Sequence, residues 1–140
     1  MTIEQYIKPS THSNSTGTLS CNTELNQNRR FTADKTELHF NQSKRNIIRA
    51  YQSSWSETMI QIGVPARFTD NTYEIGESSD ASIYFYWNGV AYIGRSGALT
   101  VHYDIDTERM WGTFYFTALN NQYNDFTNGL FDIQGLTIIK

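Results

Sequence analysis

The 140-residue sequence contains one cysteine, two prolines and no long apolar run. A single cysteine, Cys21, excludes an intramolecular disulfide and a zinc site built from several cysteines. No stretch approaches the roughly 20 apolar residues of a membrane span, and the first residues lack the basic and apolar regions of a secretory signal. We therefore expect a protein that is cytoplasmic, or exported without a conventional signal peptide, and that has no membrane partner.

Charged residues are scarce, and the basic ones form no stripe. Charged side chains make up 18% of the chain, and the formal net charge is −3. The only local concentrations of basic residues are Arg29–Arg30 and the stretch from Lys44 to Arg49. Nucleic-acid-binding proteins usually carry a basic stripe that releases counterions from phosphates. The composition therefore predicts no nucleic-acid partner.

Linear motifs for catalysis and cofactor binding are also missing. No glycine-rich phosphate loop of standard spacing occurs, and Ser96 lacks the flanking spacing of a nucleophile elbow. The three histidines, His12, His39 and His102, share no spacing typical of zinc ligands. The sequence thus predicts no cofactor, no metal and no catalytic residue, and it disfavours an enzymatic function.

What the sequence does contain is alternation of apolar and polar residues together with 14% aromatics. This composition is typical of a half-buried sheet, and the period-two pattern predicts strands. The expected strands are residues 36–42, 46–52, 57–65, 81–87, 90–94, 97–105, 109–119 and 130–140, whereas residues 68–80 are rich in turn formers. We predict an all-β fold, an antiparallel β-sandwich or a calycin-like barrel of about 8–9 strands.

The polar N-terminal region differs in texture from the rest. Residues 1–30 are expected to form an arm that is either partly flexible or an edge strand near Leu19 to Leu25, and residues 31–140 a single β domain. An exposed edge strand, in this arm or in the C-terminal segment 136–140, would allow a homodimer by strand pairing.

Three acidic residues, Asp104, Asp106 and Glu108, alternate in the segment between two expected strands. Their spacing resembles the start of a calcium loop, which needs several oxygen ligands. However, Arg109 and Tyr115 occupy the positions where such a loop needs glycine and its last carboxylate. A chain reversal at these acids keeps the apolar faces of both flanking strands on one side, so we predict a solvated hairpin tip.

Four aromatic residues, Tyr84, Tyr86, Trp111 and Tyr115, fall on the strand faces opposite the expected core. On neighbouring strands they would form a platform that stacks on sugars or anchors a protein partner. Alternatively, both faces of these strands are covered and the aromatic pairs only stabilise the sheet. These four residues are the candidate partner or ligand contacts.

Three functions follow from these features, in decreasing order of support. The first is a non-enzymatic protein-interaction module. The second is a barrel that binds an apolar or sugar-like small molecule in a cavity lined by Phe85, Phe114 and Phe116. The third is a hydrolase that uses carboxylates near Asp104 and Asp132.

Two motifs stand in the C-terminal half, Gly112-Thr113-Phe114-Tyr115-Phe116-Thr117-Ala118 and Thr127-Asn128-Gly129-Leu130-Phe131-Asp132. With the preceding segment 71–75 and the strand around Tyr84, they resemble the pattern G-T-F-x-F-x-A followed by T-N-G-x-F-D in a family of small bacterial β-proteins of unassigned function. The resemblance implies a sandwich-like or barrel-like fold and supplies no catalytic residue. Many proteins with this pattern carry a lipoprotein signal, which this sequence lacks.

Overall fold

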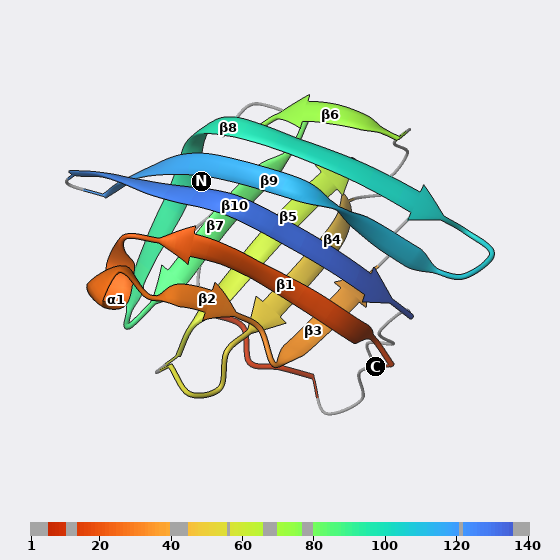
Figure 1. The fold of residues 1–140 in the computed structure, drawn as a ribbon, viewed down its shortest axis with the longest axis horizontal. Coiled ribbons are helices and arrows are strands. Elements are labelled where there is room, and N and C mark those ends of the chain that lie inside the picture. Colours follow the sequence, from red (N-terminus) through yellow and green to blue (C-terminus); the bar gives the residue numbers. More distant parts are fainter. Residues whose placement is uncertain are drawn as a thin grey trace.

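The computed structural model describes residues 6–10, 14–39, 45–55, 57–65, 70–76, 80–120 and 122–135. Within these ranges ten strands and one short helical turn are present (Figure 1). The strands are β1 (Thr16–Thr23), β2 (Arg30–Thr32), β3 (Lys35–His39), β4 (Arg45–Tyr51), β5 (Met59–Pro65), β6 (Asn71–Glu74), β7 (Ser82–Trp87), β8 (Val90–Asp104), β9 (Arg109–Asn120) and β10 (Gln122–Gln134); the turn is α1 (Leu25–Asn28). None of the helical residues described forms a segment long and apolar enough to cross a membrane.

The strands form one antiparallel sheet that curls into a half-barrel. Neighbours follow the order β2-β1-β10-β9-β8-β7-β5-β4-β3, and β6 pairs with β8 outside this path. The sheet turns at β8, whose first residues pair with β7 and whose residues from Gly94 onward pair with β9. A register shift between Gly94 and Ser96, followed by Gly97 at φ +135°, produces this bend.

The bend divides the sheet into two halves that face each other. The front half comprises β2, β1, β10, β9, β6 and residues 94–104 of β8, and the back half comprises β3, β4, β5, β7 and the start of β8 (Figure 1). The far ends of the sheet, β2 and β3, are consecutive in the chain. The Leu38 N–H also donates to the Ser15 hydroxyl at 2.9 Å, which ties β3 to the start of β1.

The inner faces of both halves bury a single apolar core. The rings of Phe116 and Phe126 stack with their centroids 4.3 Å apart, and Phe126 lies 5.0 Å from Phe85. Phe85, Phe114 and Phe116 are at most 3% exposed. The three rings proposed as the lining of an internal cavity therefore pack against other core side chains. Burial of each such side chain stabilises the fold by roughly 1.5–3 kcal/mol.

The all-β prediction is confirmed, but the strand bounds differ in several places, among them β2 (Arg30–Thr32), which lies outside every expected strand. β6 lies inside the expected loop 68–80, and the two segments expected at 90–94 and 97–105 are one strand, β8. β10 begins at Gln122 rather than near residue 130. β6 and the start of β10 were missed for the same physical reason. Most of their side chains are exposed, so these segments lack the apolar residues at every second position that predict a strand.

The segment expected to be a polar arm lies partly inside the sheet. β1 pairs with β10 on one side and with β2 on the other, so it is not an edge strand. Leu19 and Cys21 alternate toward the core and are completely buried. The sheet therefore continues across the boundary expected at residue 30. The C-terminal segment 136–140, expected to be able to pair with a second copy, lies outside the described residues.

Because Cys21 is buried, we expect its thiol to be unreactive. Burial raises the pKa of the thiol to about 12, although the nearby Arg30 partly opposes this. The thiolate is the nucleophile, so we expect iodoacetamide at pH 8 to alkylate the native protein at least about 100-fold more slowly than the urea-unfolded protein. The rates can be compared by mass spectrometry of the intact chain, and equal rates would contradict the burial of β1.

Candidate functional site

A short N-terminal segment, residues 6–10, packs on part of the outer face of the back half. Its first two side chains pack against Tyr51 and Tyr84, and the Tyr51 hydroxyl donates to the carbonyl oxygen of Ile7 at 2.8 Å. Tyr84 retains only 8% exposure. Tyr86 is partly buried in the same cluster. Two of the four predicted contact residues therefore belong to a covered face.

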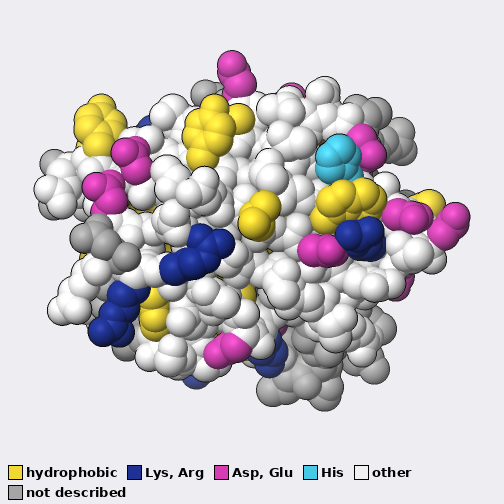
Figure 2. Space-filling view, in the orientation of Figure 1, with side chains coloured by type: hydrophobic (Ala, Val, Ile, Leu, Met, Phe, Trp, Pro, Cys, Tyr) yellow, Lys and Arg dark blue, Asp and Glu magenta, His cyan; other side chains and the backbone are white. Residues whose placement is uncertain are grey.

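No segment of the described residues covers the outer face of the front half. Tyr115, Tyr123 and Leu130 are 58%, 69% and 53% exposed, and Trp111 lies on the same face of β9 as Tyr115. Figure 2, which views the molecule from this side, shows apolar side chains separated by polar ones. Trp111 and Tyr115 are four strand residues apart, roughly 13 Å. The structure thus brings these two onto one face and does not form the expected four-residue platform with Tyr84.

The Trp111 ring contacts side chains of both β8 and β9. The His102 ring stacks on it with centroids 5.5 Å apart, and the Arg109 guanidinium carbon lies 4.3 Å from its ring centroid. Arg109 donates two hydrogen bonds to Asp132 at 2.9 and 2.8 Å, and His102 lies 3.4 Å from Asp70. Stacking and cation–π contacts therefore occupy the Trp111 ring, and Tyr115 is the more available aromatic side chain.

The acidic triplet forms a hairpin tip, as predicted. Asp104 pairs with Arg109 across the hairpin, and the intervening residues form an exposed turn. The Asp106 N–H donates to the Asp104 carboxylate at 3.0 Å, a local bond typical of aspartate in turns. Ile105, at 73% exposure, lies in this turn rather than on the inner face of the strand.

The described residues bring together no group of three or more His, Cys, Asp or Glu side chains that could hold a metal ion. His39 lies on β3 in the back half and bonds to Glu37 at 2.8 Å. His102 lies on β8 in the front half beside Asp70. The two histidines therefore have separate partners on opposite halves of the sheet.

The two carboxylates considered for hydrolysis lie on either side of Arg109. Hydrogen bonds from Arg109 hold the pKa of the Asp132 carboxyl below its usual range. A general acid must carry a proton near the working pH, which this pairing opposes. Asp104 ends β8 at the exposed hairpin tip.

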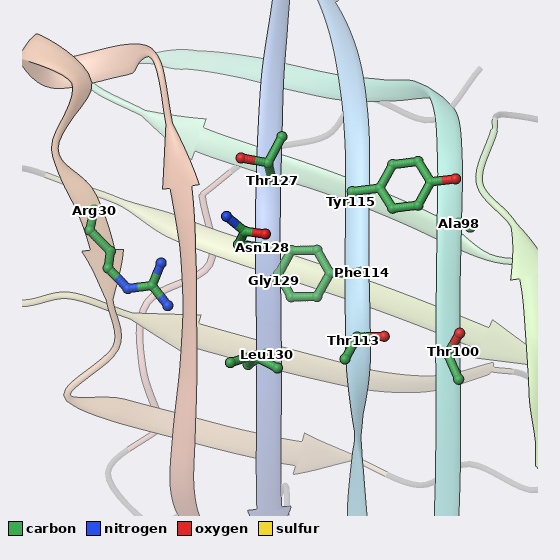
Figure 3. A pocket seen from close by; sticks show the side chains of 10 residues that line it. All are labelled: Arg30, Ala98, Thr100, Thr113, Phe114, Tyr115, Thr127, Asn128, Gly129 and Leu130. Carbon is green, nitrogen blue, oxygen red and sulfur yellow. The ribbon is translucent and has the colours of Figure 1, made fainter.

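A shallow depression of about 610 Å³ lies on the open front face (Figure 3). Its floor includes Phe114 and Gly129, and Tyr115, Leu130 and Arg30 stand around it. Its position on β8, β9 and β10, rather than between the two halves, makes it a surface feature that a partner can reach without opening the core.

The depression results from an irregularity in β10. The register between β9 and β10 shifts between Phe126 and Gly129, and Asn128 adopts φ +52°. Gly129 has no side chain, and the Phe114 ring lies directly against it, so that an added Cβ would be 2.6 Å from three ring atoms. The depression lies over this irregular pairing, with Gly129 and the underlying Phe114 ring among its lining residues.

Hydroxyl groups line the β8 and β9 side of the depression. Thr100 and Thr113 are direct cross-strand neighbours, and the hydroxyls of Thr72 and Thr100 are hydrogen-bonded at 2.9 Å. The depression thus combines apolar surface with polar groups that can be satisfied by a partner or by water.

Arg30 is the only charged residue among the described residues that line the depression. It extends from β2 over β1, where Nη1 donates to the Asn22 side-chain oxygen at 2.6 Å and Nη2 donates to the Ser20 hydroxyl at 2.7 Å. Both acceptors are neutral, and within the described part of the chain no carboxylate forms an ion pair with Arg30. In the sequence, Arg30 stands out only as part of the Arg29–Arg30 pair. Nothing local indicates that β2 lies beside β1, so the depression could not be predicted.

No protein-family model, curated protein or solved structure matches this chain. The resemblance to the small bacterial β-protein family therefore stays a prediction that rests on its two motifs.

Proposed function

We propose that this protein is a non-enzymatic protein-interaction module whose contact surface is the outer face of the front half. One observation carries the proposal: Tyr115 and Leu130 are more than half exposed on a face that no described segment covers. Tyr115 and Leu130 both line the depression on this face, and tyrosine and arginine are enriched among residues that dominate binding energy.

The distribution of charge supports the same conclusion. Apolar and hydroxyl side chains occupy the centre of the face, and charged groups such as Arg30 and the Arg109–Asp132 pair lie around them. Interfaces between proteins typically have few charges at their centre and a polar rim.

The alternatives have less support. An apolar ligand inside the half-barrel would need space that Phe85, Phe116 and Phe126 fill. A hydrolase would need a proton donor, whereas Asp132 is held ionised by Arg109. Only the hydroxyls of the surface depression favour a sugar-like ligand, and this alternative is one outcome of the tests below.

The double variant Tyr115→Ala/Leu130→Ser is expected to weaken binding of the partner at least about tenfold, because truncation of central interface residues commonly costs more than 1 kcal/mol. Its free energy of unfolding should change by less than about 0.5 kcal/mol, since both side chains are exposed. The partner can be captured through a photo-cross-linking residue at position 123, purified, and titrated by calorimetry.

The matched control for this measurement is Tyr86→Ala on the opposite half. It removes an aromatic side chain of the same size from the face that residues 6–10 cover. Loss of partner binding in Tyr86→Ala, with full binding in the double variant, would place the contact surface elsewhere.

A further inference from the structure

We infer that the partner presents a carboxylate side chain to Arg30 and seats a neighbouring apolar side chain in the depression beside Tyr115. This inference rests on the proposed function and names the chemistry of the partner at the same face. Three observations support it. Arg30 has no carboxylate partner among the described residues, no carboxylate lines the depression, and the spacing between the strands fits an extended segment of a partner.

Arg30 is fixed in position without being neutralised. Two of its five N–H donors are used by the neutral oxygens of Asn22 and Ser20. Arg109, on the same face, donates instead to the carboxylate of Asp132 in a two-bond pair. A guanidinium ordered by its own fold loses little further freedom on binding, and its bonds to a carboxylate are charge-assisted.

The lining of the depression complements an acidic partner rather than a basic one. Arg30 is the only charged residue among those described around it, and no carboxylate lines it. Figure 3 shows Arg30 extending toward β10 from one side and Tyr115 on the other side, with Leu130 and Asn128 on β10 between them. A negative group placed near Arg30 therefore meets no described repelling charge among the lining residues.

The dimensions fit one extended segment of a protein. β1 and β9 are separated by two strand spacings, about 10 Å, and same-side side chains of an extended chain are about 7 Å apart. One acidic and one apolar side chain of such a segment can thus reach Arg30 and the depression together. The exposed apolar surface of Leu130 and Tyr115 favours a protein side chain over a sugar as the second group.

The inference can be tested with a phage-displayed library of random 12-residue peptides selected on the immobilised full-length protein. We expect the selected peptides to carry Asp or Glu beside an apolar residue. As synthetic peptides they should bind Arg30→Gln at least about tenfold more weakly than the unmodified protein, since a charge-assisted pair is lost. Selection on Arg30→Glu should enrich Lys or Arg instead.

Arg109→Gln is the matched control. It removes a cation from the same face, but the charge of that cation is already neutralised by Asp132. Peptide binding to this variant should stay within about twofold of the unmodified protein, and thermal melting of each variant verifies that it is folded. Equal losses in Arg109→Gln and Arg30→Gln would indicate a general charge effect and overturn the role of Arg30.

The outcomes separate this inference from the proposed function. Peptides that lose binding to Tyr115→Ala but bind Arg30→Gln normally would overturn the carboxylate contact and leave the interaction face intact. Peptides unaffected by both Tyr115→Ala and Leu130→Ser, or a selection that yields no binder, would count against both proposals. If a titration with oligogalacturonate shows Arg30-dependent binding while no acidic peptide is selected, the ligand is an acidic sugar and the protein partner is wrong.

Discussion

Replacement of Gly129 with alanine is expected to destabilise the protein by about 2–3 kcal/mol, a cost typical of adding a methyl group where a packed core has no space. The new Cβ would lie 2.6 Å from three atoms of the Phe114 ring. This ring is 3% exposed and also contacts Phe131, with centroids 6.3 Å apart, so it cannot move aside without disturbing the core. Urea unfolding followed by circular dichroism measures the change.

A double-variant cycle shows whether the ring is the cause. Phe114→Leu alone should be destabilising, but Gly129→Ala/Phe114→Leu should cost clearly less than the sum of the two single changes, because the smaller side chain leaves room for the methyl group. Gly89→Ala is the control: Gly89 has φ +88° and nothing within 4 Å of an added Cβ, so only a backbone cost of about 1 kcal/mol is expected. Strict additivity of the two changes would contradict the ring contact.

The same geometry gives a physical meaning to the two motifs that suggested a family. Phe114 lies opposite Gly129, and Phe131 lies opposite Gly112, so β9 and β10 exchange two phenylalanine-on-glycine pairs. An added Cβ at Gly112 would lie 3.1 Å from the Phe131 ring. An aromatic ring that covers a glycine on the neighbouring strand stabilises the pairing and fixes its register. The spacing of both motifs therefore reflects packing between two strands. Asp132, the last residue of the second motif, also forms an ion pair with Arg109 between β10 and β9.

Alternation along single segments predicted most of the inner faces correctly, and Ile105 in the hairpin turn is an exception. Ile60 and Ile62 on β5, and Ile83 and Phe85 on β7, all point into the core as their spacing indicates. This works because the side-chain period of a strand is a local property. β6 gave no such signal, since its residues are mostly exposed and pair only with β8.

The candidate site depended on contacts that alternation cannot show. The sequence identified the outward faces of Tyr84 and Tyr115 equally well, yet residues 6–10 cover only the first. The depression arises from the bulge before Gly129 and from Arg30, which are about 100 residues apart in the chain and adjacent only through β1. Alternation indicates on which side a residue lies, whereas tertiary pairing determines what lies over it.

Glu37→Ala is expected to destabilise the protein by about 3–5 kcal/mol, the range typical of removing one partner from a buried ionic group. Glu37 is 1% exposed, and its carboxylate accepts hydrogen bonds from His39 Nε2 at 2.8 Å and from the Ser10 N–H. Lys35 in turn donates to the Ser10 carbonyl oxygen at 2.7 Å. Removal of the carboxylate leaves the buried His39 nitrogen and the Ser10 N–H without their acceptor, and each such group costs free energy.

The dependence of this contribution on pH follows from the pKa of Glu37. Burial by itself raises that pKa, but hydrogen bonds from His39 and Ser10 and the charge of Arg49 outweigh burial, so the net pKa lies below its ordinary value. A carboxyl whose pKa is lower in the folded than in the unfolded state stabilises the fold above the unfolded pKa of about 4.3. The difference in unfolding free energy between the unmodified protein and Glu37→Gln should therefore shrink as the pH falls below about 4.

Asp132→Ala provides the exposed control for the buried Glu37. Asp132 also has a lowered pKa, but its side chain and that of Arg109 are 48% and 43% exposed. Solvent screens such a pair, and its loss should cost less than about 1 kcal/mol.

Hydrogen exchange adds a structural measure. Glu37→Ala should increase exchange over β7, the back-half strand that carries Tyr84, because residues 6–10 lose the anchor at Ser10. Asp132→Ala should leave exchange over β7 unchanged. Equal costs and equal exchange in the two variants would show that Glu37 does not hold the N-terminal segment, and the contrast between a covered and an open face would then need another cause.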